Sequence, residues 1–183
     1  MDSTPGSKPD APPLKGSVTD STATRLIPAT AAHFDWAAAG DESAPFAGAI
    51  RLPPGGLESP QVLAWAKRIA AIVEDSTHAP GGWLIVDGDE VVGMIGFKGA
   101  PQRGVVEIGY GVVESRRSRG HATRAVAWVV IEAAARGLDL TAETSFGNLA
   151  SQIVLERNGF RRCGEREDAE DGILVLWRRN HVP

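Results

Sequence analysis

The stretch "VVEIGYGVVESRRSRGHATRAVAWVVIEAAARG", residues 105–137, changes its periodicity near its middle. Residues 105–113 are mostly β-branched or apolar, which is typical of a strand. Residues 120–136 carry apolar side chains at helical spacing, and Gly137 follows them as a signal for the end of a helix. Between the two lies "RRSRGHATR", residues 116–124, in which four of nine residues are arginine. The stretch therefore predicts a strand, a basic turn and a helix in succession.

The basic turn has the properties of an anion site. The first N–H groups of a helix have no partners within the helix, and the positive end of the helix dipole lies beside them. Gly120 permits close approach of the backbone to a ligand, Ala122 and Thr123 keep the first turn small, and Arg117 and Arg119 add charge. The nucleotide-binding pattern G-x-x-x-x-G-K-[S/T] is absent. We therefore expect a phosphate site of another kind.

The composition of the whole chain narrows the possible partners. Its 183 residues suit one domain, and its formal net charge of −4 disfavours nucleic acid as a partner. No apolar run reaches the roughly 18 residues of a membrane-spanning helix, so we expect no membrane partner. The start of the chain lacks the features of a signal peptide, and Cys163 is the only cysteine, which together favour a cytoplasmic location.

Residues 1–22 and residues 23–183 differ in composition. The first segment is rich in Pro, Ser, Thr, Gly and Asp and predicts a disordered tail, whereas the second carries the periodic patterns of a folded domain. A first strand is expected to end before Pro28, Ser59 is expected to begin a helix, and Asp87-Gly88 is expected to form a hairpin turn. The full order is β-α-α-β-β-β-α-β-α-β-β. It predicts an α/β (α+β) fold with a mixed sheet and helices on its faces.

Two motifs together resemble the GCN5-related N-acetyltransferase (GNAT) superfamily. Arg117-x-x-Gly120-x-Ala122, between a strand and a helix, is similar to the acetyl-CoA pyrophosphate loop of that family, Q/R-x-x-G-x-G/A. The segment "NLASQIVLERNGF", residues 148–160, resembles the second half of the fold and is most similar to the RimJ/RimL-like branch. The resemblance implies a mostly antiparallel GNAT sheet with helices on both faces, and acetyl-CoA as co-substrate without a metal. It implies transfer to a primary amine, on a protein N-terminus or a small molecule, by a monomer or homodimer.

The resemblance also implies which residues hold acetyl-CoA. The backbone of Val112 and Val113 would bind the pantetheine arm, and Asn148 and Ser151 would meet it near the thioester. The pyrophosphate would lie against the loop of Arg117, Ser118, Arg119, Gly120, His121, Ala122 and Thr123, with Arg157 near the adenosine phosphates. Only part of the arginine cluster can face one ligand, so Arg116 and Arg124 are expected on its solvated edges.

Acetyl transfer to an amine requires a base, because an alkyl ammonium is protonated at neutral pH. Glu107 in the apolar strand is the candidate, beside space left by glycines; the alternative is a carboxylate on an exposed sheet face. Many GNAT enzymes place a tyrosine on the last helix to protonate the thiolate, but Leu155 stands there in this chain. Ser151 is the candidate substitute, although its hydroxyl could equally bond to backbone. Tyr110 is expected to pack on the face opposite Glu107.

The acceptor side is less well defined by the sequence. Trp36, Phe46 and Trp65 lie in or between the two early helices, which border the acceptor site in the GNAT fold, although core packing is their default role. A non-catalytic acyl-CoA-binding or regulatory module is the alternative function, supported by the missing tyrosine. A nucleic-acid binder that uses the arginines is disfavoured by the acidic remainder of the chain.

Overall fold

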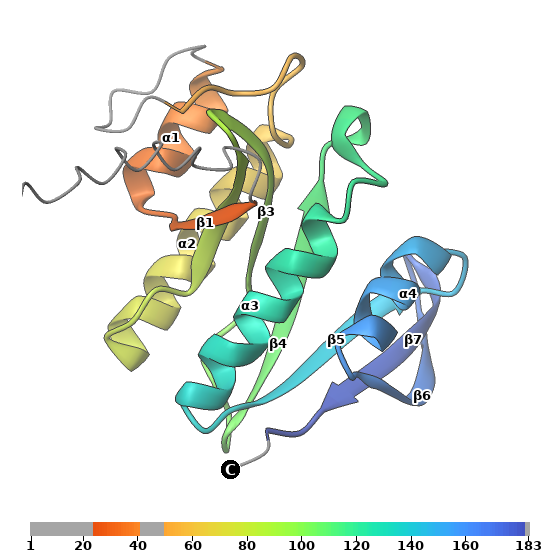
Figure 1. Ribbon diagram of the computed structural model, residues 1–183. Coiled ribbons are helices and arrows are strands. Elements are labelled where there is room, and N and C mark those ends of the chain that lie inside the picture. The colour runs from red at the N-terminus through yellow and green to blue at the C-terminus, as the bar shows by residue number, and fades with distance from the viewer. Residues whose placement is uncertain (1–23, 41–49, 182–183) are drawn as a thin grey trace, which may run out of the picture.

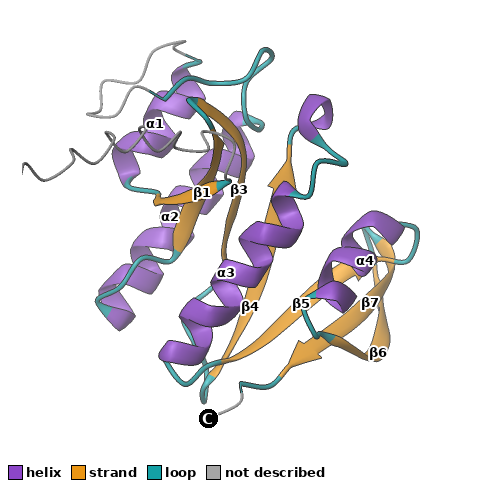
Figure 2. Ribbon diagram, viewed as in Figure 1, coloured by secondary structure: helices purple, strands orange, loops and turns teal. Residues whose placement is uncertain are grey.

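The opening stretch folds as predicted in the computed structural model, which describes residues 24–40 and 50–181. Strand β4 (Val105–Val112) is followed by a short 3₁₀ turn, η1 (Glu114–Arg116), and then by helix α3 (His121–Ala135). The other elements are β1 (Arg25–Pro28), α1 (Ala31–Ala39), α2 (Pro60–Thr77), β2 (Gly82–Asp87), β3 (Glu90–Phe97), β5 (Asp139–Ser145), α4 (Leu149–Arg157), β6 (Arg161–Asp168) and β7 (Gly172–Arg179). Their order is the one expected from the sequence (Figure 2). The predicted tail at residues 1–22 lies outside the described residues.

The seven strands form one mixed sheet in the order β1-β2-β3-β4-β5-β7-β6. Every neighbouring pair is antiparallel except β4 and β5, which run parallel. These two strands are paired only where Val105–Glu107 meets Asp139–Thr141. Beyond that point they diverge, so that the rest of β4 lacks a strand on its β5 side (Figure 1).

Helices cover both faces of the sheet (Figure 1). Helices α1 and α2 pack on one face, where Phe34 and Leu63 join Leu84 of β2 in a buried cluster. Helix α3 packs on the other face, where Val126 contacts a second cluster that includes Ile108 of β4. The diverging end of β4 is therefore packed on its α3 side, where Tyr110 and Val112 join Ile108 against this second cluster.

Local signals in the sequence account for several element ends. Ser59 begins α2, and its Oγ accepts a hydrogen bond from the N–H of Val62 at 3.3 Å. Gly88 has φ 61° in the turn between β2 and β3. Strand β1 extends through Pro28, which pairs with Trp83, although it was expected to end before this residue. An edge strand tolerates proline because one side of its backbone needs no sheet partner.

No helix within residues 24–40 and 50–181 is long and apolar enough to cross a membrane. In the same ranges, no three or more His, Cys, Asp or Glu side chains gather in a way that could hold a metal ion.

Candidate active site

The turn between β4 and α3 presents a row of unpaired backbone N–H groups. Ser118 and Gly120 have φ of 62° and 78°, which turns the chain sharply before the helix begins. Within the described chain, no N–H group from residue 118 to residue 123 has an acceptor, whereas the N–H of Arg124 already bonds to the carbonyl of Gly120 at 3.1 Å. Such a row at the positive end of a helix dipole is suited to a phosphate group.

The four arginines of this turn have different partners. Arg116 is bound internally, because its guanidinium lies 2.8 Å from the buried carboxylate of Glu90. Arg124 donates to the carbonyl of Arg119 at 2.9 Å and to Thr24 Oγ1 at 2.8 Å. Arg117 donates from Nε to the carbonyl of Val112 at 3.0 Å, and the remaining N–H groups of its guanidinium have no acceptor among the described residues. Arg119 is exposed and has no ion-pair partner among the described residues.

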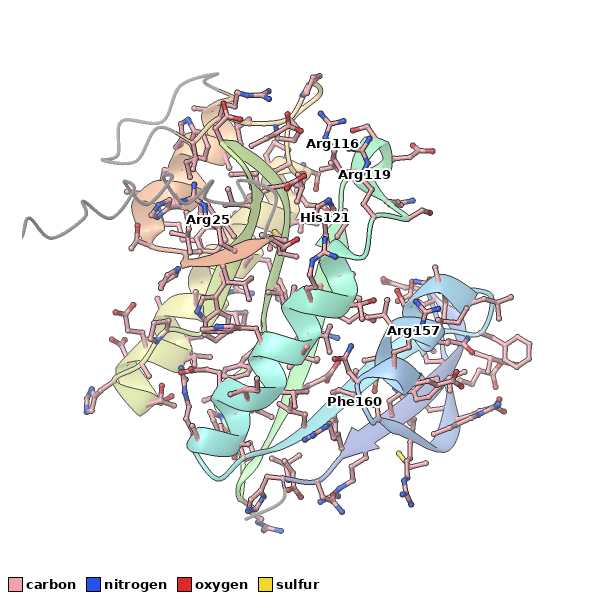
Figure 3. All side chains as sticks on the ribbon, viewed as in Figure 1. Arg25, Arg116, Arg119, His121, Arg157 and Phe160 are labelled. Atoms are coloured by element: carbon pink, nitrogen blue, oxygen red, sulfur yellow. The ribbon has the colours of Figure 1, made fainter. Side chains whose placement is uncertain are left out.

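The position of Arg116 differs from the one expected from the sequence. Arg116 was expected on a solvated edge, but it is half-buried and links the turn to β3 through Glu90. Arg51 binds the same carboxylate at 2.8 Å from the other side. The charge that remains available to a ligand at this turn therefore comes from Arg117 and from Arg119, which Figure 3 shows at the turn.

His121 is the first residue of α3, and its imidazole lies under the turn rather than in solvent. The side chain is only 3% exposed, with Nδ1 2.9 Å from Thr24 Oγ1 and Nε2 3.7 Å from Asp87. Burial lowers its pKa below the ordinary histidine value; the Asp87 carboxylate opposes this shift, and the nearby Arg124 and Arg119 add to it. The neutral imidazole thus supports the turn, while its backbone N–H belongs to the unpaired row.

The end of β4 offers one of its two predicted backbone contacts. The N–H of Val113 bonds to the carbonyl of Val92 at 3.0 Å, and its own carbonyl accepts from the N–H of Arg116 at 2.9 Å. Val113 is therefore fully engaged within the protein. Because hydrogen bonds alternate along an antiparallel strand, the N–H of Val112 points to the opposite side, where β5 has diverged. Val112 is thus the residue that can meet a ligand.

A cavity of about 290 Å³ lies beside this part of β4 and reaches across to β5 and α4. Its floor on the side of α2 is formed by Gly96, Gly109 and Gly111, where the sheet carries no side chains. The opposing wall is apolar and comes from the early helices, through Phe34, Val62, Trp65, Ala66 and Ala70, while Met94 of β3 projects from the sheet beside Gly111. The glycines do leave space on the sheet, as the sequence suggested.

Three carboxylates lie in or next to this space, and two of them already have cationic partners. Glu107 accepts from Lys98 Nζ at 2.6 Å, and Lys98, unlike Glu107, is one of the lining residues. Glu143 is held by Arg166 through two contacts of 3.0 and 2.6 Å, which lower the pKa of its carboxyl. Glu58 lines the cavity and has no cationic partner among the described residues.

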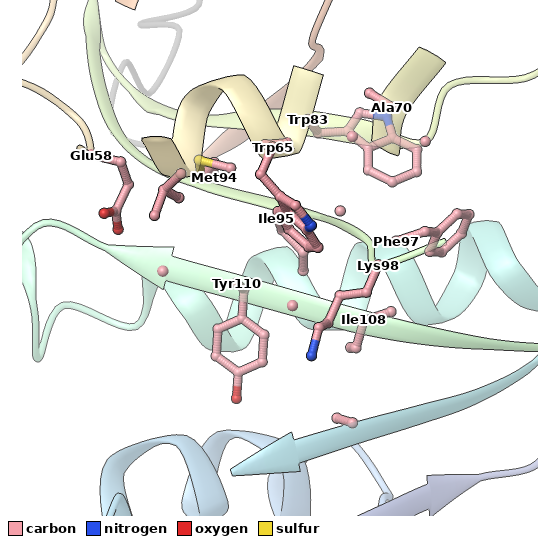
Figure 4. A pocket seen from close by; sticks show the side chains of 18 of the residues that line it. Glu58, Trp65, Ala70, Trp83, Met94, Ile95, Phe97, Lys98, Ile108 and Tyr110 are labelled. Carbon is pink, nitrogen blue, oxygen red and sulfur yellow. The ribbon is translucent and has the colours of Figure 1, made fainter. Parts of the chain in front are cut away.

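The side of the cavity nearest α4 is polar. Asn148 begins α4, and its Oδ1 accepts from the N–H of Ser151 at 3.1 Å. Tyr110 points from β4 toward α4, and its hydroxyl donates to the carbonyl of Ser151 at 3.0 Å (Figure 4). Burial raises the pKa of Tyr110 to about 12, so the phenol stays protonated. Tyr110, Asn148 and Ser151 all line the cavity, and Leu155 is fully buried in the core.

The remaining predicted residues divide between the cavity and other places. Trp65 lines the cavity from α2. Trp36 is 4% exposed and packs in the cluster of α1 and α2, away from the lining. Phe46 lies outside the described residues. Arg157 is exposed on the last turn of α4, apart from the arginines of the basic turn (Figure 3).

Sequence reasoning missed several residues of the cavity, above all Glu58 and Lys98. Lys98 follows β3 directly, and cross-strand pairing with Glu107 on the next strand could have indicated their ion pair. Glu58 precedes the helix-capping Ser59 and carries no pattern of its own in the sequence. Only the fold, which brings the start of α2 over the end of β4, reveals its position.

Comparisons with known proteins find acetyltransferases among the proteins that this chain resembles. A family model described as "Acetyltransferase (GNAT) domain" matches residues 23–161. The "Uncharacterized N-acetyltransferase YjdG" of Bacillus subtilis (strain 168) is 34% identical over 94 residues. That match spans 49% of this chain and 56% of the relative.

Solved structures share the fold at lower identity. A putative GNAT-family acetyltransferase from Bordetella pertussis is 20% identical with a TM-score of 0.64, over 85% of this chain and 94% of that one. The ribosomal-protein-S5-alanine acetyltransferase from Vibrio fischeri is 16% identical with a TM-score of 0.64, over 86% and 93% of the two chains. RimL, a ribosomal L7/L12 α-N-protein acetyltransferase in complex with coenzyme A, is 21% identical with a TM-score of 0.59, over 68% and 74%.

Proposed function

The chain belongs to the acetyltransferase (GNAT) family, and from this premise we propose that it transfers an acetyl group from acetyl-CoA to a primary amine. The observation that carries the proposal is the row of unpaired N–H groups at residues 118–123, with Arg117 and Arg119 beside it. The row fits a pyrophosphate, which needs several donors and positive charge at one place. In this proposal, residues 23–183 form the acetyltransferase domain.

The proposed path of acetyl-CoA follows β4 into the cavity. The pyrophosphate lies on residues 118–123, and the pantetheine arm runs along the side of β4 that β5 has left, where Val112 has a free N–H. Asn148 and Ser151 then meet the arm near the thioester. Arg157 is proposed for the adenosine phosphates. The N–H of Val112 is the donor proposed for the oxyanion that develops during transfer.

The proposed reaction is direct attack of the amine on the thioester within a ternary complex. The amine lone pair forms the C–N bond, and the C–S bond breaks with its electrons leaving on sulfur. A donor near sulfur promotes this step because it stabilises the departing thiolate. Ser151 is proposed for this role, since its hydroxyl makes no hydrogen bond in the described chain and lies on the cavity wall.

Glu107 is proposed to act through Lys98 rather than on the substrate. It is the carboxylate that the sequence predicted as the base, but its Oε1 is occupied by Lys98 at 2.6 Å. Lys98 projects to the cavity wall, so Glu107 can orient the lysine there. We therefore propose Glu107 as a positioning residue.

The acceptor is proposed to be a primary amine on a protein N-terminus or a small molecule. Proteins of the RimL and S5-alanine types, which share the fold, are named for ribosomal protein acceptors. Their low identity to this chain gives the fold alone, so the chemistry of the acceptor has to come from the cavity of this protein.

Two measurements test the proposed function. Acetyl-CoA and coenzyme A should raise the melting temperature of the protein, while ATP at the same concentration should not. Release of free thiol from acetyl-CoA should then depend on added amine. Stabilisation without thiol release for any amine would favour the non-catalytic acyl-CoA-binding module, and the absence of stabilisation would contradict the proposal.

A further inference from the structure

We propose that Glu58 is the carboxylate that binds the acceptor ammonium and takes its proton, and that the acceptor carries an apolar group next to that ammonium. The inference rests on the proposed function and assigns the acceptor side of the same site. It follows from the charges around the cavity, the position of Glu58 and the chemistry of the opposing wall.

The charges around the cavity distinguish Glu58 from the other carboxylates. A substrate ammonium is held best by a carboxylate that has no cation of its own. Glu107 is bound to Lys98 and Glu143 to Arg166, so both negative charges are already compensated. Glu58 is the lining carboxylate that keeps its charge free within the described chain.

The Glu58 carboxylate lies close to the end of β4. Glu58 Oε1 lies 3.4 Å from the point where a Cβ on Gly111 would stand. Gly111 precedes Val112, whose N–H faces the path proposed for the pantetheine arm. Figure 4 shows Glu58 beside the end of β4 and apart from Lys98, with Met94 and Trp65 between them. The free carboxylate is therefore close to the point where the thioester is proposed to lie.

Glu58 can be reached from outside the cavity. Glu58 also lines a second hollow, which opens between the loop of residues 54–57 and the end of β4 with η1. Gly55 and Gly56 have φ of 88° and 82° in this loop, and Glu58, which follows it, lines both the hollow and the cavity. Val112 and Arg117, which are proposed to hold the cofactor, also line this hollow, so Glu58 lies next to the proposed path of acetyl-CoA.

The rest of the cavity indicates which chemical group the acceptor carries next to its ammonium. From Glu58, the cavity continues over the glycine floor and beneath Trp65, against an apolar wall that includes Phe34 and Ala70. Its other charged lining groups, Lys98 and Glu143, are each paired with a group of opposite charge, so neither offers a free carboxylate to a second ammonium. The space therefore fits a single ammonium attached to an apolar group and disfavours polyamines and aminoglycosides.

The proton balance of the reaction defines what Glu58 does. The ammonium first gives one proton to Glu58, which leaves the neutral amine beside the thioester. When the amine attacks and the C–S bond breaks, the nitrogen loses a second proton and the sulfur gains one. The products are the amide, coenzyme A thiol and one proton, which Glu58 returns to solvent through the hollow.

Glu58→Gln tests the assignment against two matched variants. With 2-phenylethylamine as acceptor, Glu58→Gln should lower kcat/KM for the amine by about 100-fold or more, as the loss of a general base does. Its KM for acetyl-CoA should stay within about twofold, because the cofactor loop is untouched. Glu74→Gln, an exposed carboxylate on α2 away from the cavity, should match the wild type. Glu107→Gln should lose less activity than Glu58→Gln.

The activity of the wild type separates a failure of this inference from a failure of the proposed function. If the wild type acetylates the amine and Glu58→Gln is as active as Glu74→Gln, the inference is wrong while the proposed function stands. A larger loss in Glu107→Gln than in Glu58→Gln would also overturn it. If the wild type is not stabilised by acetyl-CoA, it is the proposed function that fails.

A panel of amines tests the acceptor class and its source. The free amine 2-phenylethylamine and a tetrapeptide with N-terminal phenylalanine both carry an ammonium next to an apolar group. Whichever has the higher kcat/KM shows whether the acceptor is a small amine or a peptide N-terminus. That substrate should exceed spermidine and kanamycin in kcat/KM by about tenfold or more, as expected when an apolar pocket is left unfilled. A preference for spermidine or kanamycin would overturn the apolar acceptor.

Discussion

At the scale of single residues, the basic turn divides into structural and ligand-facing arginines. Arg116 neutralises the buried Glu90, and Arg124 closes the turn on itself through the carbonyl of Arg119. Arg119 has no such task and is exposed at the row of N–H groups. The sequence assigned the ligand-facing charge to Arg117 and Arg119, but it could not reveal the internal partners of Arg116 and Arg124, because Glu90 and Thr24 are distant along the chain.

Arg119→Ala should weaken cofactor binding without weakening the fold. A charge-assisted hydrogen bond contributes about 1.5–3 kcal/mol, so the KM for acetyl-CoA should rise by about tenfold or more. The free energy of unfolding should change by less than about 0.5 kcal/mol, because the side chain has no partner to lose. Arg161→Ala, an exposed arginine on β6, is the matched control and should leave the KM unchanged. Equal KM values for the two variants would contradict a phosphate contact at Arg119.

His121 should make the stability of the protein depend on pH. Its folded-state pKa is lowered below the ordinary value of 6.5 by burial, so the folded protein favours the neutral imidazole. This contribution is present above about pH 6.5 and is lost as the pH falls from there through the lowered pKa. His121→Gln should therefore flatten the curve of melting temperature against pH between about 7 and 5. Parallel curves for the variant and the wild type would show that His121 does not titrate in this window.

At the scale of elements, strands β3 and β4 approach each other closely because of glycine. A Cβ on Gly93 would lie 2.2 Å from the carbonyl oxygen of Gly111, which is backbone and cannot turn aside. This contact fixes the end of β4, where Val112 and the cofactor turn begin. Helix and strand order could be predicted from periodicity and turn residues, but the pairing of Gly93 with the end of β4 could not, since it depends on the register of the two strands.

Gly93→Ala should destabilise the protein by about 1–3 kcal/mol, as overpacking against fixed atoms does. Gly99→Ala is the control, because a Cβ there meets nothing within 4 Å and the residue has no strained φ. Its free energy of unfolding should stay within about 0.5 kcal/mol of the wild type. Chemical denaturation of the two variants measures the difference, and similar stabilities would contradict the close approach of the strands.

At the scale of the whole molecule, the site exists because two parts of one sheet separate. Parallel pairing of β4 and β5 ends after Glu107, and α4 faces the side of β4 that is left open. The mixed sheet was predicted from the order of elements together with the family resemblance. The position of Glu58 and the pairing of Lys98 with Glu107 were not predicted, because both arise when segments far apart in the sequence meet at this opening.

Hydrogen–deuterium exchange with and without acetyl-CoA tests most directly whether this opening and its basic turn hold the cofactor. The amides of residues 118–123, which have no acceptors in the described chain, should exchange rapidly in the free protein and become protected when acetyl-CoA is added. The amide of Val113, already bonded to Val92, should be protected in both states and serves as an internal reference. Binding of acetyl-CoA with no change in exchange at residues 118–123 would contradict the account.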